Sequence, residues 1–188
     1  MDKISKFEFP IIQIAGVQNH KEAKMIADAG ANYIGIPLRL EHHPEDISEE
    51  FAAEIVKRLP DNLHPVLITY VLQAGEIIKL AGRVGCKIVQ LHGNISIPEI
   101  KNLKEKASEL LLIKSIIIGE TNAEATLDFA KQFDPHVDAF ITDTFDPETG
   151  AKGATGKTHD LNVSKGIVNA VQKPVILAGG LTPDNVED

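Results

Sequence analysis

Seven short runs of β-branched and other apolar residues recur along the chain, and each is followed by a segment in which apolar residues return with helical spacing. The runs are hydrophobic almost without interruption, which is typical of parallel strands covered by helices on both faces. The expected strands are 11–15, 33–36, 65–69, 87–91, 111–115, 139–142 and 174–177. The expected helices include 21–29, 48–59, 74–84, 97–107 and 123–133, with Ser48 capping the second.

Repeated strand–helix units form either an open doubly wound sheet or a closed eight-stranded barrel. Seven units without a composition break favour the barrel. The last expected strand leads through Ala178, Gly179 and Gly180 into Thr182-Pro183, a typical helix start. We therefore expect one domain over residues 1–188, an α/β chain of the (β/α)8-barrel type that lacks the eighth strand and the last helices.

Charge and hydropathy exclude several classes of function. The formal net charge of -8 argues against nucleic-acid binding, which needs clustered lysine and arginine. No apolar run approaches the roughly 18 residues that span a membrane, and the charged start does not resemble a signal sequence. The single Cys86 cannot form an internal disulfide. We expect a cytoplasmic protein in which Cys86 packs as a small apolar residue.

Four segments, read together, resemble the phosphoribosylanthranilate isomerase family of tryptophan biosynthesis. They are Gln-Leu-His-Gly at 90–93, Asp-Ala-Phe-Ile-Thr-Asp at 138–143, Gly-Ala-Thr-Gly-Lys-Thr at 153–158, and the stretch 174–185. Their order and spacing match the family across nearly the whole chain. The resemblance implies a barrel isomerase that performs an Amadori rearrangement, an aldose–ketose isomerisation, without a cofactor.

Asp143 ends the sixth expected strand, on the face where barrel enzymes build their active sites. The resemblance implies that it is the general acid, which protonates the ribose ring oxygen as the sugar opens. This role requires a carboxyl group whose pKa is raised towards neutrality. From the residue alone, an aspartate that caps a loop is an equally good interpretation.

Small residues in two loops suit a phosphate-binding site, because backbone N–H groups can then approach the anion. The residues that the resemblance assigns to this role are Gly153, Gly156, Ala178, Gly179 and Gly180. The alternative is that these glycines only satisfy turn geometry. A nucleotide P-loop at Gly156-Lys157-Thr158 is rejected, because Ala151 stands where that motif requires glycine.

Gln90 and His92 follow the fourth expected strand, where the resemblance implies residues that line the substrate pocket. A single histidine at a strand end is more often a structural hydrogen-bonding group. Three other histidines, His64, His136 and His159, are scattered along the chain and expected to be solvated.

The first strand departs from the family. The family pattern there is Lys-Ile-Cys-Gly, whose cysteine removes the C2 proton, whereas this chain has Gln13-Ile14-Ala15-Gly16. A methyl group cannot accept a proton, and the loss of a general base costs roughly 10²- to 10⁴-fold in rate. Cys86 cannot replace it, because it lies at the opposite end of a strand. His92, or a water that it holds, is the candidate substitute base.

A second departure follows the second strand, where the family has a Ser-Pro-Arg-like turn and this chain has His42-His43-Pro44-Glu45. Glu45 would repel an anionic substrate group unless Arg39 or a protonated histidine compensates, so Arg39 is a candidate substrate-binding residue. Adjacent histidines rarely bind one ion without further ligands, so we expect no metal site. Residues 114–117 also lack an arginine that is frequent in the family.

Two functions remain open. The first is an isomerase that uses Asp143 as acid and acts on N-(5-phosphoribosyl)anthranilate or a similar small phosphorylated sugar or ribosylamine. The alternative, which Ala15 and Glu45 favour, is a non-catalytic or re-specialised phosphosugar-binding barrel. Either would be a monomer or a homodimer without a nucleic-acid or membrane partner.

Overall fold

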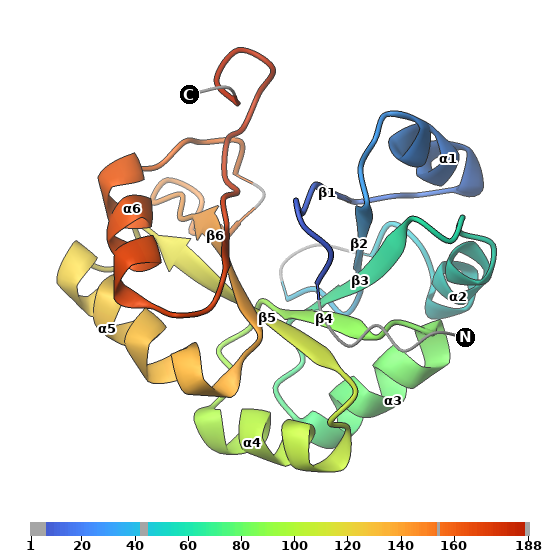
Figure 1. Ribbon diagram of the computed structural model, residues 1–188, viewed down its shortest axis with the longest axis horizontal. Coiled ribbons are helices and arrows are strands. Elements are labelled where there is room, and N and C mark those ends of the chain that lie inside the picture. The colour runs from blue at the N-terminus through green and yellow to red at the C-terminus, as the bar shows by residue number, and fades with distance from the viewer. Residues whose placement is uncertain (1–6, 42–44, 154, 187–188) are drawn as a thin grey trace. The chain divides into compact units, whose positions relative to one another are not determined.

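A computed structural model describes residues 7–41, 45–153 and 155–186 of the 188-residue chain. The fold consists of two compact units, Met1–Leu112 and Ile113–Asp188. Within each, strands and helices alternate as the hydrophobic pattern predicts (Figure 1).

The first unit contains four parallel strands in chain order. Its elements are β1 (Gln13–Ala15), α1 (His20–Asp28), β2 (Tyr33–Pro37), α2 (Glu49–Lys57), β3 (His64–Thr69), α3 (Ala74–Val84), β4 (Ile88–Leu91) and α4 (Ile97–Lys106). Each strand pairs with the next, and the register aligns Ala15 with Gly35, Gly35 with Val66, and Val66 with Ile88. Residues at these aligned positions and at every second residue from them share one face of the sheet.

The second unit has three parallel strands. Its elements are β5 (Leu111–Ile118), which begins two residues before the unit boundary, α5 (Ala123–Phe133), a 3₁₀ turn (Asp134–His136), β6 (Ala139–Thr144), α6 (Leu161–Ala170) and β7 (Val175–Ile176). Ile117 aligns with Asp143 and Ile141 with Ile176. Asp143, Ile141, Ile117 and Ile176 therefore lie on one face, and Thr142 and Thr144 lie on the other.

Polar side chains start most of the helices. Asn19, Ser48, Ser96, Asn122 and Asp160 each accept a hydrogen bond from a backbone N–H in the first turn of the following helix. Such N-caps satisfy donors that the helix itself leaves free. The expected capping role of Ser48 is confirmed, because its hydroxyl accepts from the N–H of Phe51.

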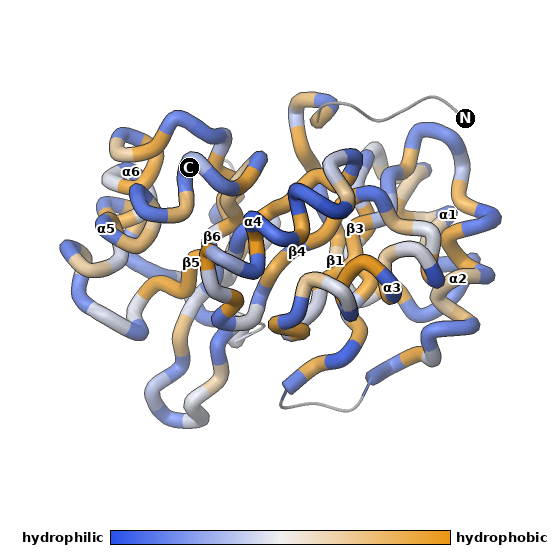
Figure 2. Tube along the Cα trace, turned by 90° about the horizontal axis from the view of Figure 1, so that it is seen from below, coloured by the Kyte–Doolittle hydropathy of each residue, from blue (hydrophilic) through white to orange (hydrophobic). Residues whose placement is uncertain are grey.

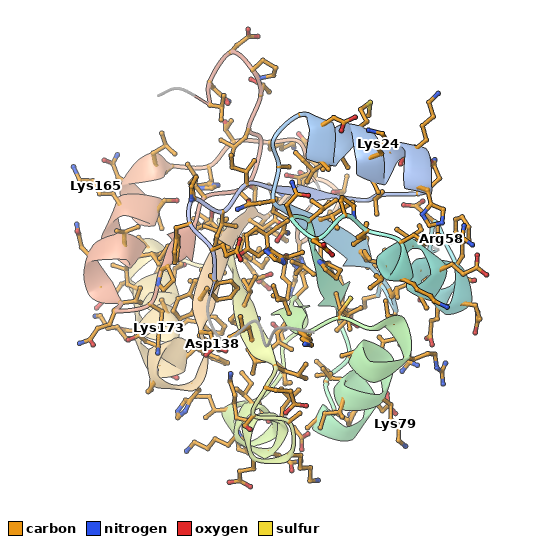
Figure 3. The ribbon with its side chains drawn as sticks, turned by 45° about the vertical axis from the view of Figure 1, so that its right-hand side comes forward. Lys24, Arg58, Lys79, Asp138, Lys165 and Lys173 are labelled. Atoms are coloured by element: carbon orange, nitrogen blue, oxygen red, sulfur yellow. The ribbon has the colours of Figure 1, made fainter. Side chains whose placement is uncertain are left out.

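The strands provide much of the hydrophobic core. Ile34, Leu67, Val89 and Phe140 are fully enclosed, and β3 and β4 are mostly apolar in Figure 2. Several charged residues lie outside this core: Figure 3 shows Lys24, Arg58, Lys79 and Lys165 directed away from the strands. Among the described residues, no helix is both long and apolar enough to span a membrane.

The fold expected from the sequence is confirmed in its order of elements, and the boundaries differ locally. β5 and β6 continue to Ile118 and Thr144, beyond the expected ends, and β7 is shorter than expected. After β7, the described residues form a single turn in which Val186 N–H donates to the Thr182 carbonyl. Cys86 is buried, and burial raises the pKa of its thiol to about 12.

Candidate functional site

The first unit gathers a group of residues on one face at the carboxyl ends of its strands. The strand register places Ala15, Gln90 and His92 on the same face, although their strands are not neighbours. The Tyr70 and His92 rings lie 4.7 Å apart between centroids. Gln90 and His92 are buried, whereas Ala15 is exposed. The sequence therefore identified three members of this strand-end cluster and missed Tyr70.

Ala15 lies against a strand position that has room only for glycine. A Cβ added to Gly35 would come within 2.8 Å of the Ala15 Cβ and 2.7 Å of the Ile68 Cδ1. The chain then turns at Gly16, whose φ of 85° favours glycine and whose N–H donates to the Gly35 carbonyl. Close packing fixes β1 on β2, and it leaves a methyl group at the position where the resemblance implies a base.

A fourth polar side chain reaches this face from the start of β1. Gln13 donates from Nε2 to the Gln90 Oε1 over 3.0 Å. The other polar atom of Gln13, its Oε1, is enclosed and has no hydrogen-bond partner among the described residues. From the sequence, Gln13 is a departure from the family pattern but is not predicted as a site residue.

Arg39 is engaged in ion pairs with helices. Its φ is 55°, its Nε donates to the Glu49 Oε1 over 2.9 Å, and its Nη1 lies 3.8 Å from the Glu76 Oε2. The hydrogen bond from Arg39 is the largest influence that lowers the pKa of the Glu49 carboxyl, and Arg83 contributes as well. The Glu45 carboxylate accepts from the Arg39 backbone N–H and so folds back on its own loop. A substrate-binding role of Arg39 stays a prediction.

The second unit presents Asp143 at the end of β6. Its Oδ1 accepts from the Thr144 N–H over 2.8 Å, on the same strand face as Ile117 and Ser115. This arrangement agrees with the expected place of a catalytic acid at the carboxyl end of a strand.

A hydrogen-bonded chain of three side chains lies beside Asp143. His159 contacts the Thr144 hydroxyl through Nδ1 at 3.1 Å and the Ser164 hydroxyl through Nε2 at 2.7 Å. Burial lowers the pKa of His159, and the charges of Asp143 and Asp160 partly oppose this shift. His159 was expected in solvent; its side chain is instead partly buried, and α6 places Ser164 against its ring.

His64 was also expected in solvent, and it is buried. Its ring lies 5.2 Å from the Tyr33 ring between centroids, and its Nε2 lies 3.2 Å from the Glu8 carboxylate. His42 and His43, considered above for a metal site, lie outside the described residues. Within the described ranges, no three histidine, cysteine, aspartate or glutamate residues form a group that could hold a metal ion.

The loop between β6 and α6 folds back on itself. Phe145 and Lys152 form an antiparallel bridge, and the Gly153 N–H donates to the Thr144 carbonyl. Lys157 closes the loop with its Nζ 2.7 Å from the Asp146 Oδ1. This contact holds the pKa of the Asp146 carboxyl below its usual range. Lys157 is therefore bound by carboxylates, which agrees with rejection of a nucleotide P-loop.

The loop after β7 packs directly on that structure. An added Cβ would lie 2.4 Å from the Thr144 Oγ1 at Gly179, and 2.6 Å from the Thr158 N at Gly180. Both glycines have positive φ, 107° and 66°, as do Gly153 and Gly156. Turn geometry and close approach thus both demand glycine here. The predicted phosphate-binding role of these glycines and of Ala178 stays a prediction.

A cavity of about 230 Å³ opens between the starts of α5 and α6. Its walls include Thr121, Thr126, Thr144 and His159, with Phe145 on the apolar side. Thr144 and His159 of the hydrogen-bonded chain therefore form part of the wall of a space next to the β7 loop, since Gly179 packs on both.

Comparison with known proteins assigns a family. Residues 12–188 match the family model described as N-(5'phosphoribosyl)anthranilate (PRA) isomerase. The chain is 38% identical over 177 residues to N-(5'-phosphoribosyl)anthranilate isomerase 2 of Methanosarcina mazei, a match that covers 93% of this chain and 76% of the relative. It is 32% identical to the isomerase of Methanocella arvoryzae, with 94% and 80% covered.

Solved structures of the same kind share the fold. The phosphoribosyl anthranilate isomerase of Thermotoga maritima matches with a TM-score of 0.77 and 26% identity, over 94% of this chain and 80% of that chain. The enzyme from Thermus thermophilus matches with a TM-score of 0.76 and 21% identity, with the same coverage. The expected barrel-type fold is confirmed by these matches.

Proposed function

Because the chain belongs to the N-(5'-phosphoribosyl)anthranilate isomerase family, we propose that it is an aldose–ketose isomerase that acts on a phosphoribosylamine, with N-(5'-phosphoribosyl)anthranilate as the first substrate to test. The observation that carries the proposal is the placement of Asp143. Its carboxyl group lies near the carboxyl end of β6 and accepts from the N–H of Thr144, the residue on which Gly179 of the β7 loop packs. A cytoplasmic protein of one barrel domain, monomeric or dimeric, is part of the same proposal.

The proposed mechanism divides proton transfer between two groups. Asp143, as general acid, gives a proton to the ribose ring oxygen, so that the ring opens to an iminium ion. A base then removes the C2 proton, and the resulting enolamine tautomerises to the ketone. No metal or cofactor enters these steps. Backbone N–H groups of the glycine loops hold the phosphate and so fix the sugar for both transfers.

The base is the unusual feature of this proposal. Ala15 has no group that accepts a proton, whereas the imidazole of His92 lies on the same face of the sheet. Its ring is held against Tyr70, and its backbone N–H donates to the Thr69 carbonyl. We assign the base to His92 or to a water bound by it.

The direct test measures conversion of N-(5'-phosphoribosyl)anthranilate by loss of its fluorescence. Asp143→Asn should lower kcat by about 10²- to 10⁴-fold, because the amide cannot supply the proton. Asp128→Asn, a change on the exposed side of α5, is the matched control and should leave kcat unchanged. Unaltered turnover in Asp143→Asn would rule out the acid role.

Ala15 also motivates the second candidate, a phosphosugar-binding protein without proton transfer. Ala15→Cys separates the two, because it restores the thiol of the family pattern on an exposed strand position. A gain of at least tenfold in kcat over Ala15→Ser, a variant of similar size and little basicity, would show a site competent for isomerisation. If neither native protein nor Ala15→Cys turns over substrate while both bind inorganic phosphate, the binding function holds instead.

A further inference from the structure

One buried acceptor in the strand-end cluster has no partner. The side-chain oxygen of Gln13 is enclosed, and no described residue donates a hydrogen bond to it. An unsatisfied buried polar group is unfavourable, because it has lost its hydrogen bonds to water without gaining others. Native proteins contain few such groups, and a buried acceptor of this kind is suited to a donor that a ligand or a bound water supplies.

The orientation of this oxygen is fixed by the strand on the far side of the sheet. Gln13 Nε2 donates to the Gln90 Oε1 over 3.0 Å, so the amide cannot rotate without breaking that bond. β1 and β4 are separated by β2 and β3, and the bond therefore passes over the face that these two strands present. The free oxygen lies on the face that also carries Ala15 and His92.

The chemistry of the missing group follows from the acceptor. A carbonyl oxygen can only accept, so its partner carries an O–H or N–H group, and a carboxylate or phosphate oxygen would be repelled. The lysine of the family pattern at this position could only donate. Glutamine at this position therefore presents a hydrogen-bond acceptor where the lysine of the family pattern presents only donors.

We propose that Gln13 is a specificity-determining residue whose side-chain oxygen accepts a hydrogen bond from a hydroxyl group of a phosphorylated sugar. This inference rests on the proposed function, since it names a contact within the same ligand class. Gln90 acts as the positioning residue that aims the amide. Gln13 lies two residues before Ala15, about 7 Å along the strand. It therefore faces a part of the ligand close to Ala15, the position where the family pattern has its base.

The test uses ribose 5-phosphate and inorganic phosphate as calorimetric probes on the full chain. Gln13→Met keeps the length of the side chain and removes both polar atoms. It should weaken binding of ribose 5-phosphate about threefold to tenfold, the value of one uncharged hydrogen bond, and leave inorganic phosphate binding unchanged. Gln132→Met, on the exposed side of α5, is the matched control.

A second variant guards against a merely structural effect. Gln90→Met keeps the side-chain oxygen of Gln13 but removes the hydrogen bond that orients it. It should therefore weaken binding of ribose 5-phosphate less than Gln13→Met does. Deoxy analogues of the sugar identify the hydroxyl group. The analogue that lacks the hydroxyl bound by Gln13 should bind equally well to native protein and to Gln13→Met. If Gln13→Met binds ribose 5-phosphate as tightly as native protein, this inference fails and the proposed function stands. If native protein binds neither probe, both fail.

Discussion

Lys114 is the most deeply buried charged residue among those described. Its side chain is about 2% exposed on β5, and its Nζ lies 5.5 Å from the Phe129 ring centroid and 6.0 Å from that of Phe133. Burial lowers its pKa to about 7, and the nearby charge of Glu120 opposes the shift only in part. The charged form of Lys114, buried against two aromatic rings of α5, therefore destabilises the folded protein at neutral pH.

Lys114→Met should stabilise the protein, and the gain should depend on pH. The unfolded lysine titrates near 10.5, so the folded state binds fewer protons between pH 7 and 10.5, and stability of the native chain rises with pH in that window. Below pH 7 the lysine is charged in both states, and burial of the charge then lowers the free energy of unfolding by its full amount, on the order of a few kcal/mol. The measurement is the difference in Tm between Lys114→Met and native protein from pH 6.5 to 10.

The difference in Tm should be largest at pH 6.5–7 and shrink towards pH 10. Lys131→Met, on an exposed position of α5, is the control and should show a small difference that does not vary with pH in this way. A constant difference for Lys114→Met would mean that burial does not shift the titration of this lysine.

Other single residues show where sequence reasoning was limited. The capping of α2 by Ser48 and the burial of Cys86 were predicted, because both follow from local pattern and residue type. The environments of His64 and His159 were not. Each is set by a partner that is distant or on a different element, Tyr33 for His64 and Ser164 for His159.

At the level of elements, the β7 loop depends on its contact with the β6–α6 loop. Gly180 has a φ of 66° and would place a Cβ 2.6 Å from the Lys157 carbonyl carbon. Gly150 also has a positive φ, 74°, but its Cβ would meet nothing within 4 Å. A comparison of Gly150 with Gly180 therefore separates the energetic cost of a positive φ from the cost of a steric clash.

Gly150→Ala should lower the free energy of unfolding by about 1–2 kcal/mol, the cost of a left-handed residue with a side chain. Gly180→Ala should lower it further, because the loops must also move apart, and should weaken binding of inorganic phosphate. Urea denaturation and calorimetry measure the two effects. Equal destabilisation by both variants, with phosphate affinity intact, would contradict the proposed packing role of Gly180.

At the scale of the whole molecule, the distribution of charge bears on the proposed class of ligand. The chain has 27 acidic and 19 basic residues, and lysines such as Lys24, Lys79 and Lys165 are directed into solvent from different helices (Figure 3). These lysines are dispersed, whereas a polyanion requires a continuous basic surface. A small phosphorylated ligand can instead be held by backbone N–H groups, whatever the net charge.

The sequence by itself determined the order of strands and helices, most helix boundaries and the family, because periodicity, caps and short motifs are local properties of the chain. It also identified Ala15 as a departure and Asp143 as the expected acid. Only the tertiary structure decided which side chains meet. The bond between Gln13 and Gln90 joins residues 77 positions apart, and the close approach of Gly179 to Thr144 joins the β7 loop to the end of β6. Such contacts arise from strand register and close packing, which no local pattern specifies.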